Sequence, residues 1–100
     1  MSLSLRVARR AESDIADAGA HYANLGDGLE ERLVNELEEL FNRLVDQPRM
    51  YIEIEPDIRR AVLHHFPYLV FYTVTKFQVV VLAVIHAAQA PAEIRRRLGA

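Results

Sequence analysis

Residues 59–91 read RRAVLHHFPYLVFYTVTKFQVVVLAVIHAAQAP and give the strongest secondary-structure signal in the chain. With Ile58 they contain three segments of strand length that are rich in Val, Ile, Phe, Tyr and Thr: Ile58–His64, Tyr68–Thr75 and Gln78–Ile85. The links between these segments, at Phe66-Pro67 and at Lys76-Phe77, are short. Short links suit antiparallel neighbours, because parallel strands need a long crossover. The stretch therefore predicts a three-stranded antiparallel meander.

Two helices are predicted before this meander. Small and apolar residues recur at spacings of three and four along the first helix, which ends at Gly26: Ala8, Ala11, Ile15, Ala18, Tyr22 and Leu25. Asp27 followed by Glu30 is a capping-box pattern that predicts the start of the second helix. This second helix has a Leu-rich face and ends before Pro48. Because few residues separate the two helices, we expect an antiparallel helical hairpin.

The two ends of the chain complete the predicted fold. Leu3–Val7 alternates apolar and polar residues, as a half-buried strand does. Residues 48–57 contain two Pro and predict a loop with a short edge strand at Tyr51–Ile54. Pro91 opens a final basic turn or helix that ends in Arg95–Arg97. The order is β-α-α-β-β-β-α, an α+β fold in which residues 1–100 form one domain and the helical hairpin packs on one face of a small, mostly antiparallel sheet.

The last strand of the meander indicates whether the sheet has a face for a partner protein. Val79–Ile85 is apolar on both faces, so this strand should lie in the interior of the sheet with each face covered. The helical hairpin covers one face. We expect the opposite face to be left open for a second molecule.

The composition is that of an ordinary globular domain, 51% hydrophobic and 26% charged. The chain has no Cys, which excludes disulfides, thiolate metal sites and Cys nucleophiles. The N-terminus lacks the apolar core of a secretory signal, and no segment is long enough to span a bilayer, so we expect a cytoplasmic protein. The net charge of −2 conceals an asymmetry: residues 27–46 carry seven acids and two bases, whereas residues 57–100 carry six bases and two acids. Such a basic region suits an acidic partner.

Four motifs within residues 59–91 resemble the C-terminal half of RelE/ParE-family toxins. They are a basic pair at Arg59-Arg60, a Phe66-Pro67-Tyr68 turn, the strand VFYTV at residues 70–74 and an apolar strand that ends in His86. The front half resembles the family through its short strand, its helical hairpin and the run Pro48–Met50. The resemblance therefore covers nearly the whole chain. It departs from the family in one place, since many relatives carry Arg about three residues after the His and this chain has Gln89.

The resemblance implies the toxin of a type II toxin–antitoxin module, held inactive by a cognate antitoxin. Some members of the superfamily cleave ribosome-bound mRNA, whereas the ParE branch inhibits DNA gyrase, and the fold alone does not choose between them. Gln89 removes a phosphate contact, and a ribosome-binding nuclease is expected to be basic, whereas this chain is slightly acidic. We therefore favour a ParE-like toxin that targets a protein, DNA gyrase, over a nuclease. A metal-independent mRNA endoribonuclease acting on the ribosome and a non-toxic antitoxin-binding module are the alternatives, and a dimer or a toxin–antitoxin hetero-oligomer is compatible with each.

Candidate site residues follow from these mechanisms. Metal-free RNA cleavage needs a general base, a general acid and cations, for which His86, Tyr72 and Arg59 are the candidates. A packing role is the alternative for His86 and Tyr72. The candidates for binding a partner are Arg60, Arg95, Arg96 and Arg97. Adjacent strand residues point to opposite faces, so Arg59 and Arg60 should separate, and His64 and His65 should not share a metal. We expect no metal and no cofactor.

Overall fold

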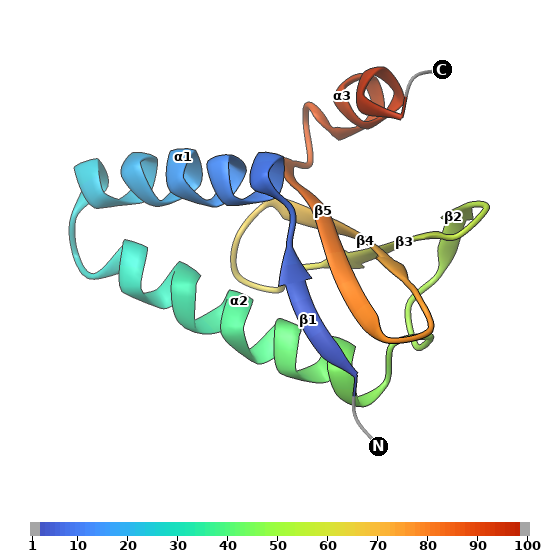
Figure 1. The fold of residues 1–100 in the computed structure, drawn as a ribbon. Helices are drawn as coiled ribbons and strands as arrows, with labels where there is room; N and C mark the ends of the chain where they lie inside the picture. Colours follow the sequence, from blue (N-terminus) through green and yellow to red (C-terminus); the bar gives the residue numbers. More distant parts are fainter. Residues whose placement is uncertain (1–2, 99–100) are drawn as a thin grey trace.

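The computed structural model describes residues 3–98. Its elements are β1 (Ser4–Val7), α1 (Arg9–Leu25), α2 (Leu29–Asp46), β2 (Glu53–Glu55), β3 (Ile58–Val62), β4 (Tyr68–Val74), β5 (Gln78–His86) and α3 (Ala90–Arg97). The five strands form one sheet in the order β1-β5-β4-β3-β2. Helices α1 and α2 lie on one side of the sheet, and α3 follows the end of β5 (Figure 1). The predicted α+β fold is confirmed.

Strands β3, β4 and β5 form the predicted antiparallel meander, with Arg59 opposite Tyr72 and Tyr68 opposite His86. Strand β1 adds to one edge by pairing parallel with β5. Strand β2 forms the other edge by pairing antiparallel with β3. The predicted edge strand is thus present, but it is shifted to Glu53–Glu55. The physical reason is that the carbonyl of Tyr51 accepts a hydrogen bond from the Arg59 guanidinium and is not part of the ladder.

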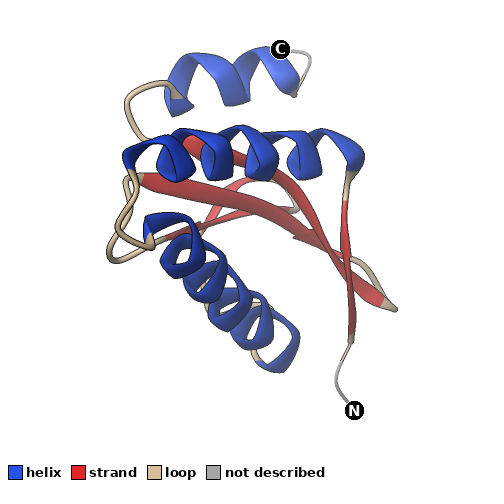
Figure 2. Cartoon of the chain, turned by 90° about the vertical axis from the view of Figure 1, so that its left-hand side faces the viewer, coloured by secondary structure: helices blue, strands red, loops and turns tan. Residues whose placement is uncertain are grey.

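The helical hairpin covers one face of the sheet, as predicted, and Figure 2 shows both helices in front of it. The Leu side chains of α2 recur on one stripe and are at most 3% exposed: Leu33, Leu37, Leu40 and Leu44. Ala11 and Ala18 are buried on α1, where small side chains allow the helix to lie close to the sheet. These residues pack on the helix-facing side chains of β4 and β5: Val70, Tyr72, Val79, Val81 and Val84.

The start of α2 differs from the prediction. Its N-cap residue is Gly28, and no side chain caps the helix. Asp27 and Gly28 have φ values of 60° and 71°, so two successive left-handed residues reverse the chain between the helices. Glycine adopts this conformation without steric cost. Because the reversal itself occupies the cap position, the capping box predicted from Asp27 and Glu30 was wrong.

The second face of the sheet is also covered, so the expectation of an open face was wrong. Phe71, Ala83 and Ile85 are at most 4% exposed and pack against Ala90 of α3. Partly buried apolar residues surround them: Ile54, Ile58, Leu69 and Ile94. The physical reason is that α3 begins four residues after β5 ends and turns its apolar side back onto the strand that it follows. Val62, which is 50% exposed, is the apolar residue left uncovered on β3.

Candidate functional site

A groove of about 560 Å³ lies at the C-terminal end of β5. Its walls come from α1, from the ends of β4 and β5, and from α3. The polar side chains that line it include Arg10, Asp17, His21, Tyr68, His86 and Gln89. Its volume is in the range of small-ligand and peptide sites. Of the predicted site residues, His86, Arg96 and Arg97 line this groove.

His86 is held in one orientation by two contacts. The backbone N–H of Ala88 donates to its Nδ1 at 3.1 Å. Its ring packs edge-on against Tyr68, with the ring centroids 5.4 Å apart. Because Nδ1 is the acceptor, the neutral ring carries its proton on Nε2. In this arrangement His86 can donate a hydrogen bond to a ligand, but its Nδ1 is not available as a base.

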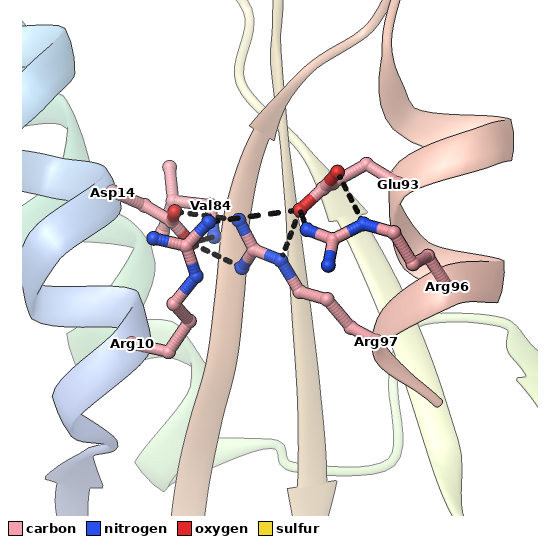
Figure 3. A network of polar contacts seen from close by, with 6 residues as sticks. All are labelled: Arg10, Asp14, Val84, Glu93, Arg96 and Arg97. Atoms are coloured by element: carbon pink, nitrogen blue, oxygen red, sulfur yellow. Dashed lines mark hydrogen bonds and ion pairs between the residues drawn. The ribbon is translucent and has the colours of Figure 1, made fainter. Parts of the chain in front are cut away.

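Asp14, Glu93 and Arg97, which line the groove, form a polar network (Figure 3). The Nη1 and Nη2 atoms of Arg97 lie 2.7 and 2.8 Å from the two carboxylate oxygens of Asp14. The same carboxylate accepts the backbone N–H of Val84 at 3.0 Å. Strand β1 ends at Val7, opposite Val81, so β5 has no strand neighbour on that side at Val84. Asp14 supplies the missing acceptor and, through Arg97, joins α3 to α1 and β5.

The charges in the groove balance one another. Glu93 bonds to Arg96 and Arg97, and these hydrogen bonds lower the pKa of Glu93 to about 2. The hydrogen bond to Asp14 and the one to Glu93 raise the pKa of Arg97, so its guanidinium stays charged. The three bases that line the groove face an equal number of acids: Arg10, Arg96 and Arg97 against Asp14, Asp17 and Glu93. The groove therefore has no excess positive charge for a phosphate.

Tyr72 and Arg59 lie elsewhere, on the helix-facing side of the sheet. Tyr72 is completely buried, and its hydroxyl donates to the Pro48 carbonyl at 2.9 Å. Burial raises the pKa of the Tyr72 phenol. Arg59 Nη1 donates to the carbonyls of Tyr51 at 2.7 Å and Arg49 at 3.3 Å. The two side chains thus attach residues 48–51 to the sheet.

The structure does not bring the predicted catalytic residues together. Tyr68 is opposite His86, and Tyr72 lies four residues further along β4, about 13 Å away at the usual rise of a strand. Arg60 is opposite Phe71 on the other face of the sheet from Arg59, as predicted. Its Nε is buried and has no hydrogen-bond partner within residues 3–98. The candidates therefore divide between the groove and the two faces of the sheet.

The three arginines of α3 also have different environments. Arg97 is used inside the molecule, and its side chain is 14% exposed. Arg96 is 66% exposed and pairs with Glu93. Arg95 lines a smaller cavity of about 320 Å³, together with Ile54 of β2 and Ile94. Of the three, Arg95 and Arg96 are accessible to a partner.

Sequence reasoning missed two acids that organise the structure, Asp14 and Glu36. Asp14 lies three residues after Ala11 and four before Ala18, within the apolar stripe of α1, and a charge in that position needs a partner. Glu36 accepts the backbone N–H groups of both His64 and His65, and it lies 3.1 Å from Nδ1 of His65. Both acids lie on buried helix faces, and an acid in such a position indicates a buried hydrogen-bond or ion-pair partner. Their partners lie 28 to 83 residues away and could not be named from spacing.

The Glu36 contacts predict a pH dependence of stability. Burial alone would raise the pKa of Glu36, but the hydrogen bonds from His64 and His65 outweigh it and hold the pKa below the ordinary 4.5. A carboxylate with a lowered pKa stabilises the fold above its unfolded pKa, and this contribution is lost as the pH falls through its folded pKa. The free energy of unfolding should therefore fall as the pH drops below 4.5, and Glu93 should add to this fall down to pH about 2.

Urea unfolding at a series of pH values measures this dependence. Glu36→Gln should make the fall in stability below pH about 4.5 shallower. Glu38→Gln, at an exposed position of the same helix, should leave the fall unchanged and is the matched control. An identical pH dependence in Glu36→Gln and the parent chain would contradict this account of the loop.

The described part of the chain contains neither a metal site nor a membrane-spanning helix. Among residues 3–98, no group of three or more His, Asp or Glu side chains is arranged to hold a metal ion. His64 and His65, whose ring centroids are 6.5 Å apart, are instead organised around Glu36. No helix within the same residues has the length and hydrophobicity needed to cross a bilayer.

Comparison with known proteins places the chain in a family. Residues 5–91 match the family model described as the ParE toxin of the type II toxin–antitoxin system parDE. The chain belongs to the ParE toxin family. The RelE/ParE resemblance seen in residues 59–91 is therefore confirmed, and the chain is a ParE-type toxin of a type II toxin–antitoxin system. No match was found among curated protein sequences.

Solved structures share the fold of this ParE-family chain. The chromosomal ParDE toxin–antitoxin system from P. aeruginosa matches with a TM-score of 0.74 and 20% identity, covering 85% of this chain and 96% of the other. An arginine double mutant of the E. coli toxin RelE in the free state matches with a TM-score of 0.61 and 22% identity, covering 96% and 98%. The same mutant in complex with a peptide of its antitoxin matches with a TM-score of 0.53 and 23% identity, covering 94% and 95%.

Proposed function

We propose that this ParE-family toxin acts in the cytoplasm on DNA gyrase and is neutralised by a cognate antitoxin. The observation that carries the proposal is the burial of Tyr72, whose hydroxyl is bonded to the Pro48 carbonyl and has no access to a substrate. General acid–base catalysis requires groups within hydrogen-bond reach of the reacting atoms. Tyr72 and His86 do not meet this requirement together. The site is better suited to binding a protein than to cleaving RNA.

The charges in the groove beside His86 also favour a protein target over RNA cleavage. RNA cleavage without a metal needs cations near the phosphate to stabilise the developing charge. In the groove beside His86, Arg96 and Arg97 are paired with Glu93 and Asp14, and Arg10 lies 3.7 Å from Glu93. One observation favours mRNA cleavage as the second candidate function. His86 lines the groove, and its Nε2 has no hydrogen bond to the protein within residues 3–98.

An antitoxin segment fits the cavity between β2 and α3, beside the covered second face of the sheet. The lining of this cavity is apolar at Ile54, Ile94 and Leu98 and carries one charge of each sign, from Arg95 and Glu55. An acidic, amphipathic segment would bury the apolar side chains and pair with the cation. The E. coli RelE relative has been solved with a peptide of its own antitoxin, which supports a partner of this kind.

The proposal is tested by two assays in parallel. The purified toxin should inhibit DNA supercoiling by gyrase, and the product of the neighbouring antitoxin gene should relieve the inhibition. In a translation extract, primer extension should find no new cleavage of mRNA. Cleaved mRNA together with normal supercoiling would overturn the proposal in favour of the nuclease. Absence of growth arrest on induced expression would favour a non-toxic antitoxin-binding module.

His86 gives a residue-level prediction. His86→Ala should leave growth arrest and gyrase inhibition within about twofold of the parent, because Tyr72, the predicted partner of His86 in proton transfer, lies four residues away along β4. His21→Ala, in the same groove, is the matched control. Growth arrest and inhibition are read as dose–response curves. If His86→Ala abolished an mRNA cleavage activity, the gyrase proposal would fall.

A further inference from the structure

The turn between β4 and β5 places an aromatic ring in water. Phe77 is 76% exposed, more than any other large apolar residue among the exposed ones: Leu25, Val34, Met50, Ile52, Val62 and Leu98. Two-residue hairpin loops usually carry Asn, Asp or Gly. This loop carries Lys76 and Phe77. Where a sequence breaks a local rule without gaining burial, a function is the expected reason.

The turn also holds Phe77 firmly. The backbone N–H of Thr75 donates to the Gln78 carbonyl at 2.8 Å. The Oγ1 of Thr75 accepts the backbone N–H groups of Phe77 at 3.3 Å and Gln78 at 3.1 Å. These hydrogen bonds fix the backbone of the turn, so binding has only the Phe77 side chain left to order, which suits an interface anchor.

Cations border the ring. The Nζ of Lys76 lies 5.7 Å from the centroid of the Phe77 ring. Arg6 of β1 reaches the same end of the sheet, where its Nε donates to Oε1 of Gln78 at 3.3 Å. Lys76 therefore lies beside the ring, and Arg6 lies against Gln78, the residue that follows Phe77. Within residues 3–98, no acid neutralises either charge.

We propose that Phe77, Lys76 and Arg6 form a docking element for the protein target of the toxin. The ring of Phe77 enters an apolar pocket on the target, and carboxylates at the rim of that pocket pair with Lys76 and Arg6. Aromatic anchors surrounded by polar contacts are typical of binding hot spots. This inference rests on the proposed function, because the target is taken to be DNA gyrase.

The position of the element separates it from the other sites. Phe77 precedes β5, and His86 ends this nine-residue strand, so about 26 Å of strand lies between the element and the groove. An antitoxin segment bound beside α3 would leave the element accessible. Altering Phe77 should therefore affect target binding and antitoxin binding differently.

A protein fits this element better than a membrane or a nucleic acid does. Stable attachment to a membrane needs a broader apolar face or a second anchor, and here a single ring is presented. Affinity for nucleic acid comes mainly from phosphate neutralisation, and the chain as a whole carries a net charge of −2. A pocket with an acidic rim matches both the ring and its two cations.

The test compares four full-length chains: the parent, Phe77→Ala, Lys76→Glu and the control Ile52→Ala. Ile52 is 62% exposed and lies outside the element, so the control removes a comparable apolar surface. Binding to purified DNA gyrase and to the purified antitoxin is measured by surface plasmon resonance. Growth arrest is measured on induced expression. Phe77→Ala and Lys76→Glu should each weaken gyrase binding at least tenfold and leave antitoxin binding within about twofold.

Each other outcome has a defined meaning. Gyrase binding that is equal for the parent and Phe77→Ala would overturn the docking element and leave the gyrase proposal intact. If the parent arrests growth but does not bind gyrase, the gyrase proposal fails, and the docking element is judged by growth arrest. A Phe77→Ala chain that binds antitoxin normally but no longer arrests growth would support the element. A Phe77→Ala chain that still arrests growth would overturn it. Binding of the parent to vesicles of phosphatidylserine, lost in Phe77→Ala, would overturn a protein target in favour of a membrane.

Discussion

Asp14→Ala should lower the free energy of unfolding by about 3 kcal/mol. The change leaves the guanidinium of Arg97, which is 14% exposed, without its carboxylate, and it leaves the backbone N–H of Val84 without an acceptor. Removing one partner of a buried ion pair costs far more than the pair contributes, because the remaining charge stays desolvated. Urea unfolding at neutral pH, followed by circular dichroism, measures the loss.

Two variants separate the contributions of Asp14. Asp17→Ala, at an exposed position on the same helix, should change stability by less than about 0.5 kcal/mol. Asp14→Asn keeps an oxygen for the N–H of Val84 and removes the charge that holds Arg97, so its effect should be intermediate. Hydrogen exchange should show faster opening of α3 in both Asp14 variants. If Asp14→Ala were as stable as Asp17→Ala, the network would not be what holds α3.

The second large effect is expected at Tyr72. Tyr72→Ala should lower the free energy of unfolding by about 4 kcal/mol, because it opens a cavity where the ring is completely buried between β4 and the helical hairpin. Tyr72→Phe keeps the ring and loses only the hydrogen bond to the Pro48 carbonyl, so about 1 kcal/mol is expected. Denaturant titration of both variants gives the two values.

The same pair of variants tests whether Tyr72 takes part in chemistry. If Tyr72 is a packing residue, Tyr72→Phe should arrest growth as the parent does, and the toxicity of Tyr72→Ala should follow its folded fraction. Tyr51→Phe, at the partly buried neighbour, is the control. A folded Tyr72→Phe chain that had lost toxicity would show that the hydroxyl acts on a substrate.

The candidate site was predictable in part. His86 could be placed at the end of a strand, and Arg59 and Arg60 on opposite faces, because the alternation of side chains follows directly from the order of residues. The motifs in residues 59–91 are sufficient to indicate the toxin family, which the family match confirms. The sequence did not show that Tyr72 would be buried against Pro48, or that Arg97 would be used within the molecule, because both depend on segments distant in the chain.

By itself, the sequence determined the elements and the meander. Helix and strand periods depend on neighbours within a few residues, and links as short as Lys76-Phe77 allow only antiparallel pairing. The tertiary structure alone decided that α3 covers the second face of the sheet, that Asp14 meets Arg97 83 residues away and that His86 lies apart from Tyr72. These encounters depend on where helices cross the sheet and on how strands are ordered, which no local periodicity encodes.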